Sequence, residues 1–568
     1  MAEGRHVRRL VALDAWPLAL SVVLCLPLLV RSGHPLARDL VFVPRQPLTD
    51  ASIGIGDGSP RAVPLDAVVS VLTHVVDGGV LARVLPLALA AAGWGAHRLA
   101  GNLGTAGRLA AGGFAVWNPF VVERLALGQW ALLLAYAALP WLAVLAARWR
   151  RESDPRSLAG VTAWLGLASL TPTGGLLGAA VALTVGLRRT RRAWWLVGVC
   201  AVLQAPWVLP SVLGPALVAS DPAGVDAFSA EAEGPGGVVV ALLGLGGVWD
   251  SGSVPTTRES WWAPASAIVV LIAVAVAWRC LDRPTGGLRN RLAWPAAAGL
   301  ALALLAHLPG GADLLRWLVA TVPGAGLLRD GHKFLAPFAI LVAIAVGVVV
   351  DRCARRLAGS VRELAVAAAL LGAALPLALL PDGALKTWKT VDPVSYPAGF
   401  DQVEEALDAE PPGDVATLPW RSYRRFEWGH GLTSSDPALR WFDRGVVVSD
   451  DLQVGPTLVR GESQRARSLG VLLRDESVAD SLREAHVGYA LVYVDDPDYG
   501  QLDLSGLELL HSDADLALYR VPGVKAPSGP PAWRRVVVAS VDVFVVALVL
   551  LGAGVGAARR RRATDPDR

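Results

Sequence analysis

The most regular feature of this chain is a series of long apolar stretches separated by short polar segments. A helix needs roughly 20 apolar residues to cross the hydrocarbon core of a bilayer, and most of these stretches approach that length. The pattern therefore predicts a polytopic α-helical membrane protein with about twelve transmembrane helices. The predicted spans are 15–31, 80–98, 105–117, 129–147, 158–173, 174–188, 193–212, 263–279, 292–308, 335–351, 362–380 and 536–557.

Clusters of Arg fall in every second gap between the apolar stretches. Because short loops rich in Lys and Arg stay in the cytoplasm, these clusters mark the cytoplasmic side. An even number of spans puts every cluster on that side together with both termini, whereas an odd number would put some clusters outside. The clusters are Arg5, Arg8 and Arg9; Arg148, Arg150 and Arg151; Arg188, Arg189, Arg191 and Arg192; Arg279 to Arg291; Arg352, Arg355 and Arg356; and Arg559 to Arg562.

The other gaps are predicted to lie outside the cytoplasm. They divide the chain into a membrane core at 1–380, an outer domain at 381–535, and a final span with a basic cytoplasmic tail at 536–568. Within the core, the apolar periodicity of 63–76 predicts an amphipathic helix along the membrane, and 236–248 is too short to span. The outer loops of the core are 32–79, 118–128, 213–262 and 309–334.

The 381–535 block alternates short β-branched or aromatic runs with helical stretches, which predicts a small extracytoplasmic α/β domain. The predicted strands are Val415–Leu418, Val446–Val448, Tyr489–Tyr493 and Leu516–Tyr519. The predicted helices are Asp401–Ala409, Glu462–Leu473 and Ser477–Glu484.

Composition agrees with a membrane protein. Of 568 residues, 53% are hydrophobic and 18% charged, with a mean hydropathy of +0.46 and a net charge of +3. None of the four Cys falls in 381–535, so no disulfide framework is predicted there. No Cys/His spacing suggests zinc, and no glycine-rich segment has the context of a nucleotide site. The sequence leaves open whether a divalent cation takes part, and it does not indicate the oligomeric state.

The first outer loop carries the first candidate site. Asp39 follows Arg38 directly, and Arg45 and Asp50 come shortly after them. A carboxylate can accept the proton of a hydroxyl group, and Arg can bind a phosphate bidentately. These residue types suit sugar transfer from a lipid phosphate. The alternative is a juxtamembrane loop whose charges meet water and lipid headgroups.

The second candidate segment runs from Asn118 to Trp130. Its Glu123 and Arg124 lie between apolar stretches, where charges are costly unless they are paired or face a polar cavity. We expect them to shape such a cavity together with Gln129. The alternative is a structural ion pair or an anchor at the membrane interface.

The third segment immediately precedes the tenth span and contains Arg329, Asp330, His332 and Lys333. Positive charge is disfavoured on the outer side, so this concentration of cations is informative. Arg and Lys suit a phosphate or pyrophosphate headgroup. The alternative is a loop that extends its charges into lipid headgroups.

The outer block offers Trp420, Arg421, Tyr423 and Trp428 as candidates for holding an acceptor. Aromatic side chains interleaved with Arg suit contacts with sugar rings and polyanions. Nucleic acid can also be bound in this way, but a location outside the cytoplasm argues against it. The alternative is a packed strand and turn.

Taken together, these segments resemble the bacterial GT-C-type membrane glycosyltransferases, and more broadly the arabinofuranosyltransferase-like and YfhO-like envelope proteins. The residues that carry the resemblance are Arg38-Asp39, the Asn-Pro-Phe-x-x-Glu-Arg-Leu-x-x-Gly-Gln segment from Asn118 to Gln129, and the Arg-Asp-Gly-His-Lys-Phe segment from Arg329 to Phe334. The resemblance implies a polyprenyl-phosphate sugar donor and an acceptor glycan or lipid of the cell envelope. It also implies a catalytic carboxylate in the first outer loop, which is Asp39 or, as second choice, Asp50.

The expected function is therefore sugar transfer at the outer face of the cell membrane, with the donor phosphate held by Arg38, Arg45, Arg329 and Lys333. The alternative is a non-catalytic transporter or assembly factor for envelope lipids or glycans. That class more often shows inverted repeats with broken helices, and no internal repeat is evident in the sequence.

Overall fold

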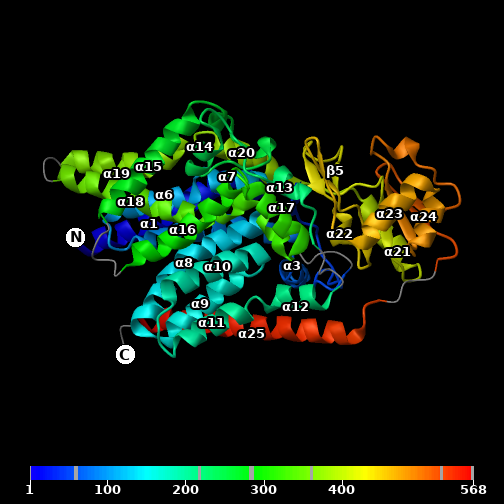
Figure 1. Ribbon diagram of the computed structural model, residues 1–568, viewed down its shortest axis with the longest axis horizontal. Helices are drawn as coiled ribbons and strands as arrows, with labels where there is room; N and C mark the ends of the chain where they lie inside the picture. Colours follow the sequence, from blue (N-terminus) through cyan, green and yellow to red (C-terminus); the bar gives the residue numbers. More distant parts are fainter. Residues whose placement is uncertain are drawn as a thin grey trace.

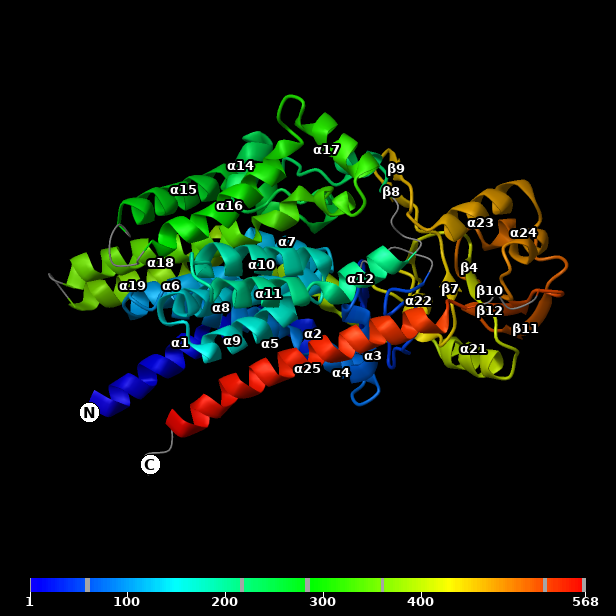
Figure 2. The ribbon, with the colours of Figure 1, turned by 60° about the horizontal axis from the view of Figure 1, so that its bottom comes forward.

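The computed structural model consists of a bundle of helices joined to a smaller domain that contains most of the strands (Figure 1). It describes residues 2–56, 62–214, 219–280, 287–358, 362–524 and 529–563. Both ends of the described chain lie at the end of the bundle that is far from these strands (Figure 2). The last five residues of the predicted basic tail, 564–568, lie outside the described residues.

Every predicted span coincides with a helix or with a closely spaced pair of helices. These helices are α1 (Ala2–Leu24) with α2 (Leu26–Val30), α4 (Gly78–Ala82) with α5 (Leu85–Leu99), α6 (Thr105–Val116), α8 (Trp130–Glu152), α9 (Pro155–Ala168), α10 (Pro172–Gly186), α11 (Ala193–Val202) with α12 (Ala205–Leu213), α15 (Trp262–Cys280), α16 (Leu288–Leu305), α18 (Ala336–Ala358), α19 (Arg362–Leu379) and α25 (Ala532–Ala563).

Fewer of these helices meet the requirements for crossing a bilayer alone. Among the described residues, five are long and apolar enough, or up to seven if two bent helix pairs each count as one span. Helices α6, α9 and α10 contain 12, 14 and 15 residues, short of the roughly 20 that a bilayer requires. The chain is thus a helical membrane protein, and the count of twelve spans stays a prediction.

The helices differ widely in burial, which indicates their places in the bundle. In the span that contains α18, 83% of the most apolar window is buried inside the protein, against 17% for α25. Helix α18 packs against α6, α15, α16 and α19, and α25 packs against α9 and α12 on the outside. The core of the bundle therefore lies around α18, and the rest of the protein leaves most of the apolar surface of α25 uncovered, as expected for a helix that faces lipid.

Shorter helices lie between these long helices and within the outer domain. They are α3 (Leu65–Thr73), α7 (Pro119–Ala126), α13 (Ala223–Ala227), α14 (Gly237–Leu243), α17 (Gly311–Thr321), α20 (Gly383–Val391) and α22 (Ala438–Trp441), and the 3-10 helices η1 (Ser251–Ser253), η2 (Thr256–Glu259), η3 (Ala325–Leu328), η4 (Gly331–Leu335) and η5 (Tyr499–Gln501). Helix α3 lies within the segment predicted to be amphipathic. Helix α7 begins at an Asn118 cap, whose side chain accepts a hydrogen bond from Val121 N at 3.1 Å, and continues with Pro119.

The outer domain is built on a five-stranded sheet in the order β11-β12-β10-β4-β7. Strands β10, β4 and β7 are parallel, and β12 and β11 are antiparallel to their neighbours. All five residues of β10 are buried, as expected for a central strand that is covered on both faces. The strands are β4 (Val415–Leu418), β7 (Val446–Val447), β10 (Tyr489–Tyr493), β11 (Glu508–Ser512) and β12 (Leu516–Arg520), and the helices are α21 (Gly399–Asp408), α23 (Gln464–Asp475) and α24 (Val478–Glu484).

The predicted elements of this domain are confirmed. Strands β4 and β10 have the predicted bounds, and each predicted helix is present within about two residues, the usual uncertainty of helix ends. Strand β11 was not predicted. All five of its residues are exposed or half-buried on the edge of the sheet, so it lacks the buried apolar run that marks a central strand.

The first outer loop is built into the outer domain. Its strands β1 (His34–Ala37) and β2 (Leu40–Val41) form a hairpin, and β1 also pairs with β3 (Pro393–Val394) at the start of the outer domain. A second hairpin, β5 (Tyr423–Arg425) with β6 (Thr433–Ser435), meets the first through a bridge between Arg38 and Ser434. A third hairpin, β8 (Leu452–Val454) with β9 (Thr457–Val459), extends toward α13. The membrane core and outer domain thus meet at the Arg38-Asp39 segment.

Candidate functional site

A cavity of about 1350 Å³ lies where the helical bundle meets the outer domain. Its walls come from both the bundle and the outer domain, and they contain charged, apolar and aromatic residues. From the bundle and its loops they include Arg38, Asp39, Gln129, Trp130, Pro172, Trp207, Arg329, Asp330 and Lys333. From the outer domain they include Trp420, Arg421, Tyr423, Gln453 and Glu462. The cavity is large enough for a substrate with both polar and apolar parts.

Asp39 lies in the wall of this cavity, at the tip of the β1–β2 hairpin. Ala37 pairs with Leu40, so only Arg38 and Asp39 form the turn, and Arg38 has a left-handed backbone with φ 55°. One oxygen of Asp39 accepts a hydrogen bond from the hydroxyl of Tyr423. The other lies 3.5 Å from Nε2 of Gln129, which donates to it. The carboxylate is therefore half-buried and is held between the outer domain and the bundle.

Gly128 packs directly against the backbone of this turn. It has a left-handed φ of 77°, and a Cβ atom at this position would lie 2.6 Å from Leu40 N and 2.8 Å from Asp39 N. These are backbone atoms that cannot turn away as a side chain can. The glycine therefore allows the segment after α7 to pack closely against the turn that carries Asp39.

Replacing Gly128 by Ala is expected to destabilise the protein, because both the backbone conformation and the close contact become unfavourable. The matched control is Gly324→Ala, since Gly324 has a similar φ of 82° but a Cβ atom added there would meet no other atom within 4 Å. We expect Gly128→Ala to cost on the order of 1–3 kcal/mol more than the control, the usual cost of an atom forced into a packed site, measured by thermal unfolding in detergent. Equal losses would show that the close contact carries no cost.

Arg38 turns away from Asp39 toward the loop that precedes η1. Its guanidinium pairs with Asp250 at 2.8 Å, and both side chains are mostly buried. Its backbone is fixed by two hydrogen bonds to β6, from Arg38 N to Thr433 O at 2.7 Å and from Ser435 N to Arg38 O at 2.9 Å. The positive charge beside Asp39 is thus already balanced by Asp250, and the turn has little freedom to move.

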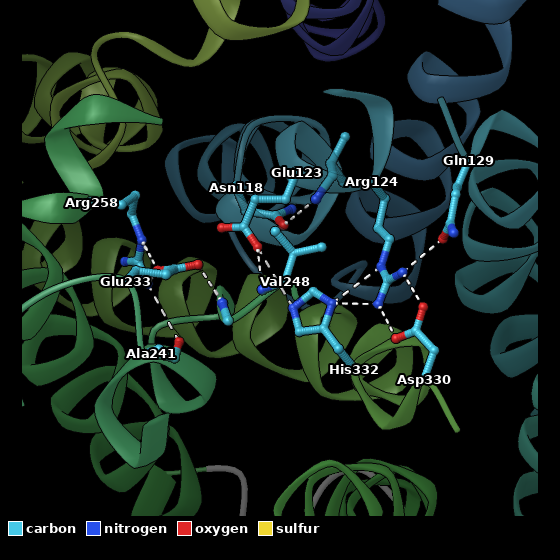
Figure 3. A network of polar contacts seen from close by, with 12 residues as sticks. Asn118, Glu123, Arg124, Gln129, Glu233, Ala241, Val248, Arg258, Asp330 and His332 are labelled. Atoms are coloured by element: carbon cyan, nitrogen blue, oxygen red, sulfur yellow. Dashed lines mark hydrogen bonds and ion pairs between the residues drawn. The ribbon is translucent and has the colours of Figure 1, made fainter. Parts of the chain in front are cut away.

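Behind Gln129 lies a fully buried Arg124 (Figure 3). Its guanidinium donates to both oxygens of Asp330 at 2.7 Å each, and to Oε1 of Gln129 at 2.7 Å. It also donates to Nδ1 of His332, from Nη2 at 2.6 Å and from Nε at 3.1 Å. Since a guanidinium can only donate, Nδ1 is the acceptor and the ring proton of His332 is on Nε2.

The network continues from His332 to residues that the sequence analysis missed. Nε2 of His332 faces the carboxyl of Glu123 at 3.7 Å, and Glu123 lies close enough to Glu233 for the two carboxyl groups to interact electrostatically. Glu233 in turn pairs with a fully buried Arg258 at 2.6 Å. Figure 3 shows these side chains in a row, from Arg258 through the central Glu123 and His332 to Gln129. A signal for Arg258 was present: it is a cation in a loop predicted to lie outside.

The charges of this network balance in pairs. Arg124 pairs with Asp330 and Arg258 pairs with Glu233. Burial and the neighbouring Glu233 raise the pKa of the remaining carboxyl, Glu123, well above its usual value, which favours its neutral form. Burial alone would raise the pKa of Asp330, but the neighbouring cations Arg124 and Lys333 together outweigh it and lower that pKa. Paired charges with additional hydrogen bonds are the arrangement that makes buried ions tolerable.

Two cations of the third predicted segment line the cavity itself. The ammonium of Lys333 is 3.6 Å from Asp330, which Arg124 already binds through both oxygens. Arg329 donates to Glu462 of the outer domain at 3.1 Å and lies over the ring of Phe228. These two cations and Asp39 therefore belong to one cavity, as their shared wall shows.

The structure brings three of the four predicted acceptor residues to the cavity: Trp420, Arg421 and Tyr423. Arg421 is also paired with Asp496 at 3.3 Å and with Asp498. Trp428 lies elsewhere, stacked on Phe426 within the aromatic core of the outer domain at 4.5 Å between ring centres.

Two residues of the first outer loop also lie away from the cavity lining. Asp50 pairs with Arg535 at the start of α25, at 2.5 Å. Arg45 is exposed and interacts electrostatically with Glu404 of α21. The hairpin directs Asp39 inward, whereas the chain beyond it runs toward α3 and the surface.

Within the part of the chain that the structure describes, no cluster of three His, Cys, Asp or Glu side chains has the arrangement of a metal site. Two acids of the cavity, Asp250 and Glu462, instead pair with Arg38 and Arg329.

No family model matches the sequence, and no curated protein matches it. Among solved structures, the fold is similar to the cryo-EM structure of the arabinofuranosyltransferase AftD from Mycobacteria. The TM-score is 0.56 at 16% identity, over 92% of this chain and 40% of that one. A mutant of AftD gives 0.50 at 16% identity, over 90% of this chain and 42% of that one. The crystal structure of ArnT from Cupriavidus metallidurans bound to undecaprenyl phosphate gives 0.40 at 13% identity, over 93% and 100% of the two chains.

The likeness to AftD extends over almost the whole of this chain, including both the helical bundle and the outer domain, although the chain spans less than half of AftD. At this level of identity it concerns the fold. The chain therefore has the fold of a GT-C-type membrane glycosyltransferase, as its sequence resemblance predicted.

Proposed function

We propose that this protein is a membrane glycosyltransferase that takes a sugar from a polyprenyl-phosphate donor and transfers it to a glycan or lipid acceptor of the cell envelope. The observation that carries the proposal is the position of Asp39. It is the one candidate base of the first outer loop that faces the cavity between bundle and outer domain, with its carboxylate oriented by Gln129 and Tyr423.

In the proposed reaction, the hydroxyl oxygen of the acceptor attacks the anomeric carbon of the donor sugar. Asp39 accepts the proton that this hydroxyl group loses. The bond between this carbon and the phosphate oxygen breaks, and polyprenyl phosphate leaves. Attack from the side opposite the phosphate inverts the configuration. General base catalysis by a positioned carboxylate contributes about 10²–10⁴-fold to such a step.

The phosphate of the donor would lie near Lys333 and Arg329, with Arg38 as a third cation. Lys333 is the best placed of them, because its partner Asp330 is already bound by Arg124 and its ammonium can turn to a ligand. Apolar residues of α8 and α12 in the cavity wall, including Trp130 and Trp207, would contact the first part of the prenyl chain. Of the four cations predicted to bind the phosphate, the proposal keeps Arg38, Arg329 and Lys333. It leaves out Arg45, which is exposed.

Replacing Lys333 by Met is expected to raise the KM for the donor by about 10–100-fold, because a hydrogen bond to a charged group contributes roughly 1.5–3 kcal/mol. The KM for the acceptor should change little. The control is Lys389→Met, which removes an exposed Lys of α20 that does not line the cavity. Kinetics in membranes with varied donor concentration provide the measurement, and equal donor KM values in both variants would remove Lys333 from the phosphate site.

The acceptor would be held by the outer domain, whose Trp420 and Arg421 face the cavity across from the bundle. We also propose that the chain is divided at the predicted limits, into 1–380, 381–535 and 536–568. In this proposal it crosses the membrane twelve times and has both termini in the cytoplasm. The positions of the Arg clusters in the sequence support that orientation.

The test is transfer of labelled sugar from polyprenyl-phosphate donors by membranes that contain the protein. Transfer that requires Asp39 would establish the activity. A transporter or assembly factor would instead tolerate loss of Asp39 while still depending on the cations that bind the phosphate. Absence of transfer from every donor offered would therefore favour that alternative.

A further inference from the structure

The oxygen of Asp39 that faces the outer domain already has a hydroxyl partner. The phenol of Tyr423 donates its hydrogen bond to Oδ1 of Asp39, while Gln129 donates to the other oxygen. Both Tyr423 and Asp39 line the cavity. The side chain that would accept the proton of a substrate hydroxyl is thus occupied by a hydroxyl that belongs to the protein.

The backbone holds Tyr423 in this position. It is the first residue of β5 and pairs with Ser435 of β6, and Ser435 N donates to Arg38 O at 2.9 Å. Only one strand therefore separates Tyr423 from the turn that carries Asp39. The phenol cannot drift away with a mobile loop, but rotation of the side chain would release the carboxylate.

A phenol is well suited to this position because it resembles the acceptor group without reacting. A phenol is a much weaker acid than a carboxylic acid, so the phenol donates the hydrogen bond and the carboxylate accepts it. Water carries the same O–H donor group and can reach Oδ1 when no other hydroxyl occupies that place. In a transferase this competition decides whether the sugar passes to the acceptor or is lost to hydrolysis.

We propose that Tyr423 is a specificity-determining residue, whose hydroxyl occupies the place of the acceptor hydroxyl on Asp39 and keeps water from it until the acceptor displaces the phenol. The inference rests on the proposed transferase function. The outer domain then has a role beyond holding the acceptor, because it supplies the group that protects the base.

The unwanted reaction is the hydrolysis of the donor. The oxygen of water attacks the anomeric carbon and its proton passes to Asp39, while the bond between that carbon and the phosphate oxygen breaks. The products are the free sugar and polyprenyl phosphate, which keeps the electron pair of the broken bond. No further reactant is needed, so removing the phenol is sufficient to expose this route.

The experiment compares wild type with Tyr423→Phe, using a labelled polyprenyl-phosphate sugar with and without acceptor. Free sugar and transferred sugar are measured in the same sample. The matched control is Tyr489→Phe, which also removes a phenol hydrogen bond, 2.7 Å to Pro411 O, but lies outside the cavity lining. The double variant Asp39→Asn with Tyr423→Phe tests whether any hydrolysis depends on Asp39.

The inference predicts that Tyr423→Phe releases about tenfold more free sugar than wild type when acceptor is absent. It also predicts a lower KM for the acceptor, since the acceptor no longer competes with the phenol. The double variant should lose this hydrolysis, and Tyr489→Phe should behave as wild type. A merely structural role would lower transfer and hydrolysis together and would leave their ratio unchanged.

Wild-type transfer combined with an unchanged ratio of free to transferred sugar in Tyr423→Phe would overturn the inference and leave the proposed function intact. Loss of transfer without any gain in free sugar would overturn it as well, since Tyr423 would then be needed for the productive reaction. If wild type neither transfers nor hydrolyses any donor, both the proposed function and the inference fail.

Discussion

Asp39→Asn is expected to lower the rate of sugar transfer by about 10²–10⁴-fold, the range that a positioned general base contributes. Asn has the same shape and keeps an oxygen that can accept from Gln129 or Tyr423, so the turn and the fold should persist. It cannot accept the proton of an acceptor hydroxyl under ordinary conditions. The measurement is transfer of labelled sugar by membranes that contain equal amounts of each variant.

The matched control is Asp50→Asn, because it makes the same chemical change in the same outer loop. Asp50 pairs with Arg535 at the surface and lies outside the cavity lining, so its loss should leave transfer within about twofold, as is usual for exposed ion pairs. The reverse result, a severe loss in Asp50→Asn and normal transfer in Asp39→Asn, would exchange their roles. Full transfer by both variants would remove the first outer loop from the chemistry.

Arg124→Met is expected to destabilise the protein by about 3–5 kcal/mol, because it leaves a buried carboxylate without its partner. The side chain of Arg124 is fully buried and binds Asp330 through two hydrogen bonds of 2.7 Å. Met has a similar length and fills much of the space, so the loss reflects charge more than packing. Thermal unfolding of the purified protein in detergent provides the measurement.

Two further variants separate charge from shape. Glu123→Gln changes a buried carboxyl of the same network, but one whose raised pKa favours the neutral form that Gln resembles, so its effect should stay below about 1 kcal/mol. Combining Arg124→Met with Asp330→Asn removes both charges and should restore part of the lost stability. A double variant no more stable than Arg124→Met would show that the unpaired carboxylate was not the cause.

The same variant connects stability to the site. The side-chain oxygen of Gln129 accepts a hydrogen bond from Arg124 at 2.7 Å, and its side-chain nitrogen donates to Asp39 at 3.5 Å. Arg124 therefore fixes the orientation of the amide whose nitrogen donates to the candidate base. The buried network makes the floor of the cavity rigid, which is the property that a precisely oriented carboxylate requires.

The local elements of the protein could be read from the sequence because their signals are local. Long apolar runs predict helices in a membrane wherever they occur, since a backbone in lipid must satisfy its own hydrogen bonds. All twelve predicted spans correspond to helices or helix pairs, and β4 and β10 have the predicted bounds. The number of helices that cross the membrane is harder to predict from the sequence. Short helices such as α6 are apolar but not long enough to cross a bilayer alone.

The charged segments of the candidate site were also visible in the sequence, since charges beside apolar stretches are costly and therefore conspicuous. Their partners were not visible. Arg124 and Asp330 are 206 positions apart, and Asp39 and Tyr423 are 384 apart, so no periodicity or spacing connects them. Glu123 and Arg124 are neighbours in the sequence but have separate partners, because adjacent residues of α7 point in different directions.

The sequence by itself thus determined the membrane character, the helices, the central strands of the outer domain and the segments that carry charge. Only the tertiary structure decided that Asp39 faces the cavity while Asp50 faces Arg535, and that Glu233 and Arg258 extend the buried network. The physical reason is the range of the forces involved. Hydrophobic periodicity acts over a few residues, whereas burial of a charge requires a partner that folding alone brings within about 3 Å.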